Sequence, residues 1–243
     1  MSLLESIKKD IRAARERDPA ATSNLEVVLA YPGFHALQLH RVAHALHRRH
    51  VPIAPRFISH LNRMVTGIEI HPGARIGDGL FIDHGMGVVI GETTEIGANC
   101  HLYQGVTLGG TSTKREKRHP TLGSNVSVGA GAKLIGAITV GDNASIGAGS
   151  VVVTNVPENA TVVGVPGHIV AYKDPGSDTV LHLPDPEWDR ITALEERIES
   201  LTAQVQALEA QLKASPGNRR TGARRTSSTG SQPPGRRPPL EHT

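Results

Sequence analysis

The chain has 243 residues, of which 20% are charged and only 3% are aromatic. This length suits one principal domain with accessory segments, and so few aromatic residues indicate a narrow core with little room for rings. No stretch approaches the apolar length of a membrane span, and the first residues lack the basic-then-apolar order of a signal peptide. We therefore expect a cytoplasmic protein that has no membrane partner.

The net charge of +3 is distributed unevenly along the chain. Residues 215–243 contain six arginines and one glutamate, a net charge of +5, whereas residues 1–214 have a net charge of −2. The tail has too few apolar residues to offset the entropy of ordering, so it is predicted to be disordered. Because it contains no aromatic residue that could stack on a base, nucleic acid is a disfavoured partner.

Residues 1–68 have the pattern of a helical domain. Ser2 and Glu5 form a capping box, apolar residues follow on one helix face, and the run stops at Asp18-Pro19. Further helices are expected to begin at Asn24 and at Phe34, and to run from Pro55 to Gly67.

Three histidines, His40, His44 and His47, share one face of the helix that begins at Phe34. They resemble metal ligands in their spacing. No acidic residue or cysteine lies at ligand spacing beside them, so we interpret them as a polar helix face.

Between residues 70 and 152 an aliphatic residue recurs every six positions. This spacing fits neither the helix period of 3.6 nor the strand period of 2, whereas a parallel β-helix needs a six-residue repeat. The fifth residue of each unit is also expected to point inward and to be small. The aliphatic positions are Ile70, Ile76, Ile82, Val88, Ile90, Ile96, Leu102, Leu108, Leu122, Val128, Leu134, Val140, Ile146 and Val152. The fifth positions are Ala74, Thr94, Cys100, Val106, Ala132, Ala144 and Ser150. Cys100, the single cysteine, is thus read as a small buried residue, and it excludes an internal disulfide framework.

After the repeats, residues 171–186 are rich in proline and glycine and are read as a linker. A heptad pattern follows, with mostly β-branched residues at one seam position and leucine at the other, which is typical of parallel two-stranded coiled coils. A trimer imposed by the preceding repeats, or a single helix packed on its own domain, remains an alternative. The seam residues are Ile191, Leu194, Ile198, Leu201, Val205, Leu208 and Leu212.

Two segments break the six-residue repeat and are therefore candidate functional sites. The first is a two-residue slip after Ile82-Asp83-His84-Gly85, and the second is the charged loop from Gly109 to Thr121. The repeat alone does not decide the chemistry, because such prisms serve acyltransferases, sugar nucleotidyl enzymes, zinc carbonic anhydrases and non-catalytic subunits.

The strings IEIHPGARIGDGLFIDHGMGVVIGETTEIG, QGVTLGG and KRHPTLG, with the earlier RAARERDPA and YPGFHALQLHRVAHAL, resemble the serine O-acetyltransferase family of hexapeptide-repeat acyltransferases. The resemblance covers about two-thirds of the chain. It implies an α+β fold, in which an N-terminal α-helical domain (1–68) precedes a left-handed parallel β-helix (69–170). The linker (171–186), the coiled-coil helix (187–214) and the disordered basic tail (215–243) complete the expected organisation.

Members of that family transfer acetyl from acetyl-CoA to the hydroxyl of L-serine, giving O-acetyl-L-serine and CoA in cysteine biosynthesis. The resemblance places the general base at His84, whose neutral imidazole can take the hydroxyl proton near pH 7. It places an orienting carboxylate at Glu69, where the family often has aspartate.

The resemblance also assigns binding residues. Asp18 and Asp83 match the acids that hold the serine ammonium, and Arg118 and His119 match the donors to its carboxylate. The residues assigned to the acetyl-CoA groove are Gly109, Gly110, Gly129, Ala130, Lys133 and Ala148. Gly109 and Gly110 also leave backbone amides open to a developing oxyanion.

L-Cysteine is implied as a feedback inhibitor, and a homotrimer as the assembly. His168 stands where the family often has an arginine near coenzyme A, and the last residues do not match the tail that binds O-acetylserine sulfhydrylase, so that complex is not implied. Two alternatives stay open: an acetyltransferase for another hydroxyl acceptor such as a sugar, and a metal-binding prism. Four histidines could supply metal ligands, but the strings around them do not match the zinc class, so no metal is expected. These histidines are His71, His84, His101 and His119.

Overall fold

The computed structural model describes residues 3–174, 180–182 and 186–214. They divide into two compact units on either side of the bond between residues 185 and 186. The expected capping residue Ser2 and the basic tail 215–243 lie outside the described residues. Within the described part, no helix combines the length and apolar character needed to cross a membrane.

The first unit begins with four helices whose ends follow local chain chemistry: α1 (Leu3–Arg17), α2 (Asn24–Ala30), α3 (Pro32–Arg48) and α4 (Ala54–Thr66). The Ser23 hydroxyl caps α2 by accepting the Glu26 amide at 3.1 Å, and Pro32 occupies the first turn of α3, where its missing N–H costs nothing. Gly67 ends α4 in the left-handed conformation. The helix expected at Asn24 is confirmed. The helix expected from Phe34 begins two residues earlier, at Pro32, and the one expected from Pro55 to Gly67 spans Ala54–Thr66.

The interpretation of His40, His44 and His47 as a polar helix face is wrong for His40, whereas His44 is partly buried and His47 is exposed. His40 is only 4% exposed, and its ring lies 5.6 Å from that of His44. His44 Nδ1 donates to the carbonyl oxygen of Pro72 at 2.8 Å, and the ring of His47 lies beside that of His71. This face of α3 therefore packs on the first coil of the repeats, a contact that only the tertiary structure creates.

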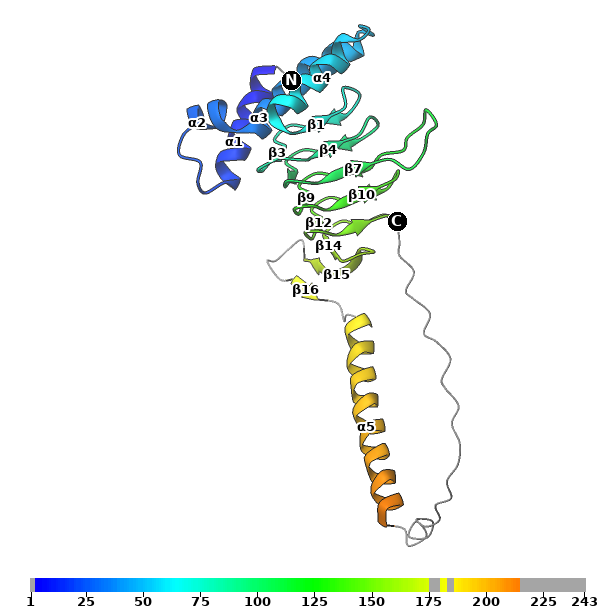
Figure 1. Cartoon of the computed structure of the whole chain (residues 1–243). Coiled ribbons are helices and arrows are strands. Elements are labelled where there is room, and N and C mark those ends of the chain that lie inside the picture. The colour runs from blue at the N-terminus through cyan, green and yellow to red at the C-terminus, as the bar shows by residue number, and fades with distance from the viewer. Residues whose placement is uncertain (1–2, 175–179, 183–185, 215–243) are drawn as a thin grey trace, which may run out of the picture. The chain divides into compact units, whose positions relative to one another are not determined.

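The repeats form a parallel β-helix with three sheets (Figure 1). Sheet A consists of β1 (Glu69–Ile70), β4 (Val89–Ile90), β7 (Thr107–Gly109), β10 (Lys133–Ile135) and β13 (Val151–Val152). Sheet B consists of β2 (Arg75–Ile76), β5 (Glu95–Ile96), β8 (Thr121–Leu122) and β11 (Thr139–Val140). Sheet C contains β3 (Phe81–Ile82), β6 (His101–Leu102), β9 (Ser127–Val128), β12 (Ser145–Ile146) and β14 (Ala160–Val163). Each strand pairs in parallel with the strand one coil away, so the chain climbs one layer for every three strands.

The interior of the β-helix confirms both inward registers of the repeat. The predicted aliphatic residues stack in rows, as in the pairing of Ile70 with Ile90 and of Ile90 with Leu108, and all are buried except Ile76, which is partly buried. The seven predicted fifth-position residues are all 0% exposed, Cys100 among them. Burial raises the pKa of the Cys100 thiol to about 11, which agrees with a packing role.

The helices gather at the end of the β-helix that carries β1 and β3 (Figure 1). Two buried polar side chains of α4 tie them together: Ser59 donates to the carbonyl oxygen of Ile70 at 2.6 Å, and Asn62 donates to that of Ala36 at 3.0 Å. Because buried polar groups need partners, these bonds fix how α3 and α4 sit on the first strand.

The segment 171–186, expected to be a linker, is partly strand. β15 (His168–Lys173) runs antiparallel to β14, and β16 (Val180–His182) pairs with β15. The Pro- and Gly-rich composition concealed these strands, whose partner lies at the end of sheet C. Residues 175–179 and 183–185 of this segment lie outside the described residues.

The second unit contains one long helix, α5 (Pro186–Ala214), as the heptad pattern predicts. All seven seam residues are at least 45% exposed within this unit. The helix is confirmed, whereas its pairing with another helix stays a prediction.

Candidate active site

Most candidate residues lie on two edges of the β-helix, whereas Asp18 follows α1 and Glu69 belongs to β1. Turns between sheets C and A, which we call the His84 edge, contain residues 83–88, 103–106, 129–132 and 147–150. Turns between sheets A and B, which we call the Arg118 edge, contain residues 71–74, 91–94, 110–120 and 136–138. The two-residue slip lies on the first edge, and the charged loop projects from the second (green in Figure 1).

His84 lies in the slip that follows β3. Its backbone has a positive φ of 58°, which a residue with a side chain adopts rarely and at an energetic cost. Its side chain is 75% exposed, and Nε2 lies 4.0 Å from Oδ1 of Asp83. The unusual backbone thus presents an open imidazole next to a carboxylate.

Asp18 joins this group from the other end of the sequence. It follows α1 directly, and its Oδ1 accepts the Ala20 amide at 2.8 Å while its Oδ2 accepts the Tyr31 hydroxyl at 2.5 Å. These hydrogen bonds, that from Tyr31 first, and the nearby charge of His84 lower the pKa of Asp18. The Asp18 hydrogen bond, burial and the charges of Asp18 and Asp83 raise the pKa of Tyr31 to about 12.

A close backbone approach brings these elements together. Gly33, in the first turn of α3, lies so near the carbonyl of Ile82 that a Cβ there would be 2.2 Å from its oxygen. Only glycine fits at that distance, so the start of α3 can lie directly against the end of β3. This approach brings Asp18 near His84, where Asp83 already lies as the preceding residue of the chain.

Glu69 is engaged elsewhere. Its carboxylate accepts a hydrogen bond from Arg63 of α4 at 2.9 Å, and both side chains are substantially exposed. In the described part of the chain, Glu69 makes no hydrogen bond or ion pair with His84.

In the later coils of the β-helix, the His84 edge is open. A Cβ at Gly131 or at Gly149 would meet no atom within 4 Å, so these turns leave a free surface. Gly129, Ala130 and Ala148 belong to the same turns, and Lys133 reaches this edge by donating to the carbonyl oxygen of Gly105 at 2.5 Å. The other two predicted groove residues, Gly109 and Gly110, lie at the Arg118 edge.

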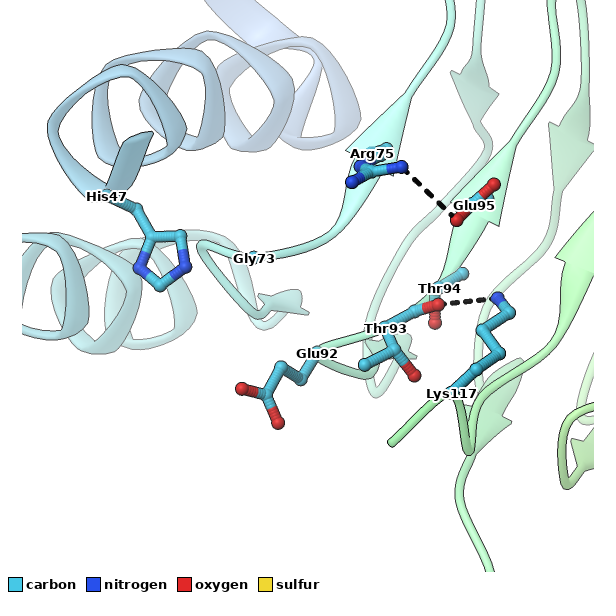
Figure 2. Close-up of a pocket in the computed structure, with 8 residues that line it drawn as sticks. All are labelled: His47, Gly73, Arg75, Glu92, Thr93, Thr94, Glu95 and Lys117. Carbon is cyan, nitrogen blue, oxygen red and sulfur yellow. Dashed lines mark hydrogen bonds and ion pairs between the residues drawn. The ribbon is translucent and has the colours of Figure 1, made fainter. Parts of the chain in front are cut away.

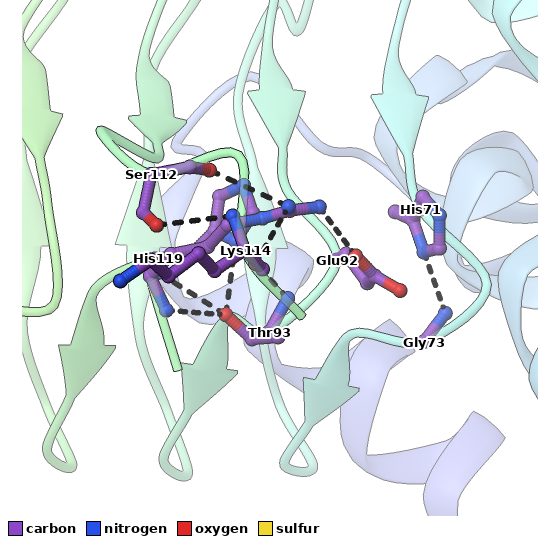
Figure 3. A network of polar contacts seen from close by, with 8 residues as sticks. His71, Gly73, Glu92, Thr93, Ser112, Lys114 and His119 are labelled. Atoms are coloured by element: carbon purple, nitrogen blue, oxygen red, sulfur yellow. Dashed lines mark hydrogen bonds and ion pairs between the residues drawn. The ribbon is translucent and has the colours of Figure 1, made fainter. Parts of the chain in front are cut away.

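The Arg118 edge is held by a dense polar network (Figure 3). Arg118 Nη2 forms an ion pair with Glu92 at 2.5 Å, and its Nη1 donates to the carbonyl oxygens of Ser112 and Lys114. The guanidinium thus closes its own loop onto the turn after β4.

His119 lies in the same network and is 9% exposed. Its Nδ1 contacts Thr93, and its ring lies over Gly91, where a Cβ would come within 2.2 Å of Nε2. Burial, and then the charge of Arg118, lower the pKa of His119. The lowered pKa favours the neutral form of the imidazole.

A hollow of about 340 Å³ lies beside this edge (Figure 2). Its charged groups are largely paired: Arg75 lies 3.5 Å from Glu95, and Lys117 donates to the carbonyl oxygen of Thr93 at 2.6 Å. The lining residues are His47, Gly73, Arg75, Glu92, Thr93, Thr94, Glu95 and Lys117.

Several residues of these networks were not predicted from the sequence, among them Tyr31, Glu92 and Thr93. Tyr31 stands inside one of the quoted family strings, but nothing in its spacing pointed to Asp18. Glu92 and Thr93 occupy the third and fourth positions of their repeat, which the pattern leaves variable, so only the folded loop reveals them. Across the described residues, no group of three His, Cys, Asp or Glu side chains has the arrangement of a metal site.

Residues 1–39 match the family described as "Serine acetyltransferase, N-terminal", and residues 119–154 match "Bacterial transferase hexapeptide (six repeats)". A serine acetyltransferase of Synechococcus elongatus is 54% identical over 208 residues, covering 82% of this chain and 85% of that protein. One from Synechocystis is 57% identical over 204 residues, covering 83% and 82%.

Solved structures agree with these relatives. The serine acetyltransferase of Neisseria gonorrhoeae in complex with serine has a TM-score of 0.67 at 44% identity, covering 69% of each chain. That of Brucella abortus in complex with coenzyme A has a TM-score of 0.68 at 42% identity, covering 70% of this chain and 68% of the other. The β-helix described above is accordingly the left-handed one of these enzymes. The chain belongs to the serine acetyltransferase family.

Proposed function

We propose that the chain transfers the acetyl group of acetyl-CoA to the hydroxyl of L-serine, giving O-acetyl-L-serine and CoA. The observation that carries the proposal is the exposed His84 imidazole with two carboxylates, Asp83 and Asp18, beside it at the head of an open edge. The complexes of relatives with serine and with coenzyme A support the same pair of substrates.

In the proposed reaction His84 acts as the general base. Its unprotonated nitrogen takes the hydroxyl proton while the serine oxygen attacks the thioester carbonyl carbon. When the tetrahedral intermediate collapses, the C–S bond breaks and the imidazolium returns the proton to the departing sulfur. No covalent enzyme intermediate is needed, because both substrates are bound at once.

The acids beside His84 suit the serine ammonium. Asp18 is held ionised by its hydrogen bonds, and it approaches from a helix, whereas Asp83 comes from the slip itself. Acetyl-CoA would lie along the His84 edge, where the glycine turns leave room for it. Gly109 and Gly110 of another chain would complete the groove.

The donors to the serine carboxylate, Arg118 and His119, lie on the other edge of the same chain. A complete site therefore needs a second copy, whose Arg118 edge meets the His84 edge of the first. Three copies joined in this head-to-tail manner close a ring, which is the trimer we propose. L-Cysteine, which has the same ammonium and carboxylate, would compete for this site.

Two assays test the proposal. The first offers acetyl-CoA with L-serine, sugars and other hydroxyl acceptors, with and without a chelator, and we expect CoA release with serine far above the others and no effect of the chelator. A preference for another acceptor would overturn the substrate assignment.

The second assay tests the shared site. His84→Ala and His119→Ala variants should each be nearly inactive, but trimers assembled from an equal mixture should recover about a quarter of the wild-type activity, since one in four edges then pairs two intact halves. Each variant taken alone through the same mixing procedure serves as the control and should stay nearly inactive. Mixed trimers with no recovered activity would show that each site is built from one chain.

A further inference from the structure

We propose that Thr93 is a positioning residue that holds His119 as a neutral imidazole with its proton on Nε2, so that Nε2 donates a hydrogen bond to the bound substrate. The proposal rests on the proposed function for the identity of that substrate, and its acceptor would be a carboxylate oxygen of serine. No sequence motif distinguishes Thr93 from its neighbours.

The first observation is a backbone hydrogen bond. The N–H of Thr93 donates to Nδ1 of His119 at 3.2 Å. A backbone amide can only donate, so the ring nitrogen that receives it carries no proton. Of the two neutral forms of the imidazole, this bond is compatible only with the one protonated on Nε2.

The second observation is the complete hydrogen-bond complement of the Thr93 hydroxyl. Its Oγ1 accepts the backbone amide of Arg118 at 3.0 Å and that of His119 at 3.1 Å. Both amides are donors, so they use the two lone pairs of the oxygen, and the hydroxyl hydrogen is left for a third partner. That partner is His119 Nδ1, 2.9 Å away, whose single lone pair the hydroxyl shares with the Thr93 backbone amide. The amide bond and the hydroxyl geometry therefore indicate the same tautomer.

The charges around the ring agree with a neutral His119. Burial and the positive charges of Arg118 and Lys117 lower its pKa, while Glu92 acts in the opposite direction. His71, whose pKa burial lowers to about 4, is a further titratable group near the ring and is neutral at pH 7. These charges favour the neutral ring, which has a single proton, and Thr93 decides which nitrogen carries it.

The third observation concerns the other nitrogen. Nε2 lies between two glycines, since an added Cβ would come within 2.2 Å of it at Gly91 and within 3.0 Å at Gly110. Among the described residues, no hydrogen bond reaches Nε2. The Nε2–H is thus left for a ligand.

A fixed tautomer matters because the two forms present opposite properties at Nε2. A protonated Nε2 attracts a carboxylate oxygen, whereas an unprotonated one presents a lone pair to it and repels it. Thr93 therefore adds to substrate affinity without contacting the substrate. The structure also offers a matched control, because the adjacent Thr94 is fully buried and its Oγ1 has no hydrogen-bond partner in the described part of the chain.

The direct test is ¹⁵N NMR of the wild-type enzyme labelled in its histidine rings at pH 7, with His119→Gln used to assign the signal. We expect a protonated Nε2 and an unprotonated Nδ1. A proton on Nδ1, or an imidazolium, would refute the proposal whether or not serine is the substrate. Conversely, an acceptor other than serine would overturn the proposed function and leave this spectrum unchanged.

Kinetics of three variants provide the second test. Thr93→Val keeps the backbone amide and removes the hydroxyl, which bonds His119 Nδ1 and the amides of Arg118 and His119. The loss of these bonds should raise the KM for serine about tenfold, with a smaller change in kcat. Thr93→Ser, which keeps the hydroxyl, should restore the KM, and Thr94→Val should leave both parameters unchanged. An equal rise in KM in Thr93→Val and Thr93→Ser would refute a role for the hydroxyl. Thermal melting of each variant shows whether a rise in KM comes from misfolding instead.

Discussion

The Tyr31 hydroxyl donates a hydrogen bond of 2.5 Å to Oδ2 of Asp18, which links the junction of α2 and α3 to the residue that follows α1. The Tyr31 ring is partly buried and packs against a small apolar cluster that includes Phe81 of β3. With its pKa raised to about 12, the hydroxyl remains a donor throughout the physiological range. Asp18 is therefore anchored beside His84 as an ionised carboxylate.

Replacing Tyr31 with phenylalanine keeps the ring and removes this anchor. The pKa of Asp18 should rise from its lowered value, so a higher pH is then required to ionise it. We expect kcat/KM for serine to fall about tenfold, which is the effect of losing one hydrogen bond to a charged group. The acid limb of the profile of kcat/KM against pH should move to higher pH. Profiles of kcat/KM against pH for both proteins provide the measurement. Tyr172→Phe, on β15, is the control and should match the wild type.

His84→Ala should lower kcat by about 10²–10⁴-fold with little change in secondary structure, because the variant removes the general base. Stopped assays of CoA release and circular dichroism measure the two effects. Full activity in this variant would remove His84 from the mechanism.

Glu69→Gln tests whether this carboxylate orients His84 or only pairs with Arg63. We expect a loss of activity smaller than that of His84→Ala, since glutamine keeps the shape and loses the charge. Arg63→Ala is the informative comparison, because it removes the ion pair and leaves Glu69 in place. If Glu69→Gln lowers thermal stability alone, Glu69 has a structural role.

L-Cysteine should raise the apparent KM for serine without lowering the maximal rate, because both amino acids offer the same ammonium and carboxylate. Asp83→Ala and Arg118→Ala should weaken serine and cysteine in parallel. Initial rates over a grid of both concentrations decide the matter. Inhibition that serine cannot relieve would indicate a separate regulatory site.

Acid should destabilise the protein through His40. Burial lowers the pKa of His40 to about 3, below the ordinary value of 6.5, so the unfolded chain binds a proton that the folded chain does not. Above pH 6.5 the ring is neutral in both states, so the folded protein loses no stability. As the pH falls from there towards 3, the unfolded chain binds a proton that the folded chain does not, and the free energy of unfolding decreases. Thermal melting between pH 7 and 4 should show this decline, and His40→Gln should make it shallower. Identical slopes would assign the decline to other groups, such as His71.

Deleting residues 187–243 should lower the thermal stability yet leave a trimer with most of the activity, if the faces of the β-helix set the assembly and α5 adds to it. Arg190 and Glu195 flank the apolar seam of α5. In a parallel pair of helices, Arg190 of one helix would attract Glu195 of the other. Light-scattering mass before and after truncation is the measurement. A truncated monomer would show that α5 holds the chains together.

The sequence by itself determined the β-helix and placed the helices of the first unit. A six-residue period with a second inward position at Ala74, Thr94 and Cys100 leaves one solution, because each coil buries only those side chains. Local chemistry likewise set the ends of α2 and α4, where a serine cap and a left-handed glycine act within a few residues. The slip near His84 and the loop from Gly109 to Thr121 were visible because they interrupt the six-residue period, and they marked both candidate edges.

Only the tertiary structure decided which side chains meet. Asp18 reaches His84 through the approach of Gly33 to Ile82, a contact between residues 49 positions apart in the sequence that no local pattern encodes. The burial of His40 on the first coil, the strands within 171–186 and the bond from Thr93 to His119 also depend on partners distant in the sequence. Periodicity reports which way a residue faces, whereas hydrogen bonds and pKa values depend on what lies opposite, and that is fixed only when the loop and helices fold onto the prism.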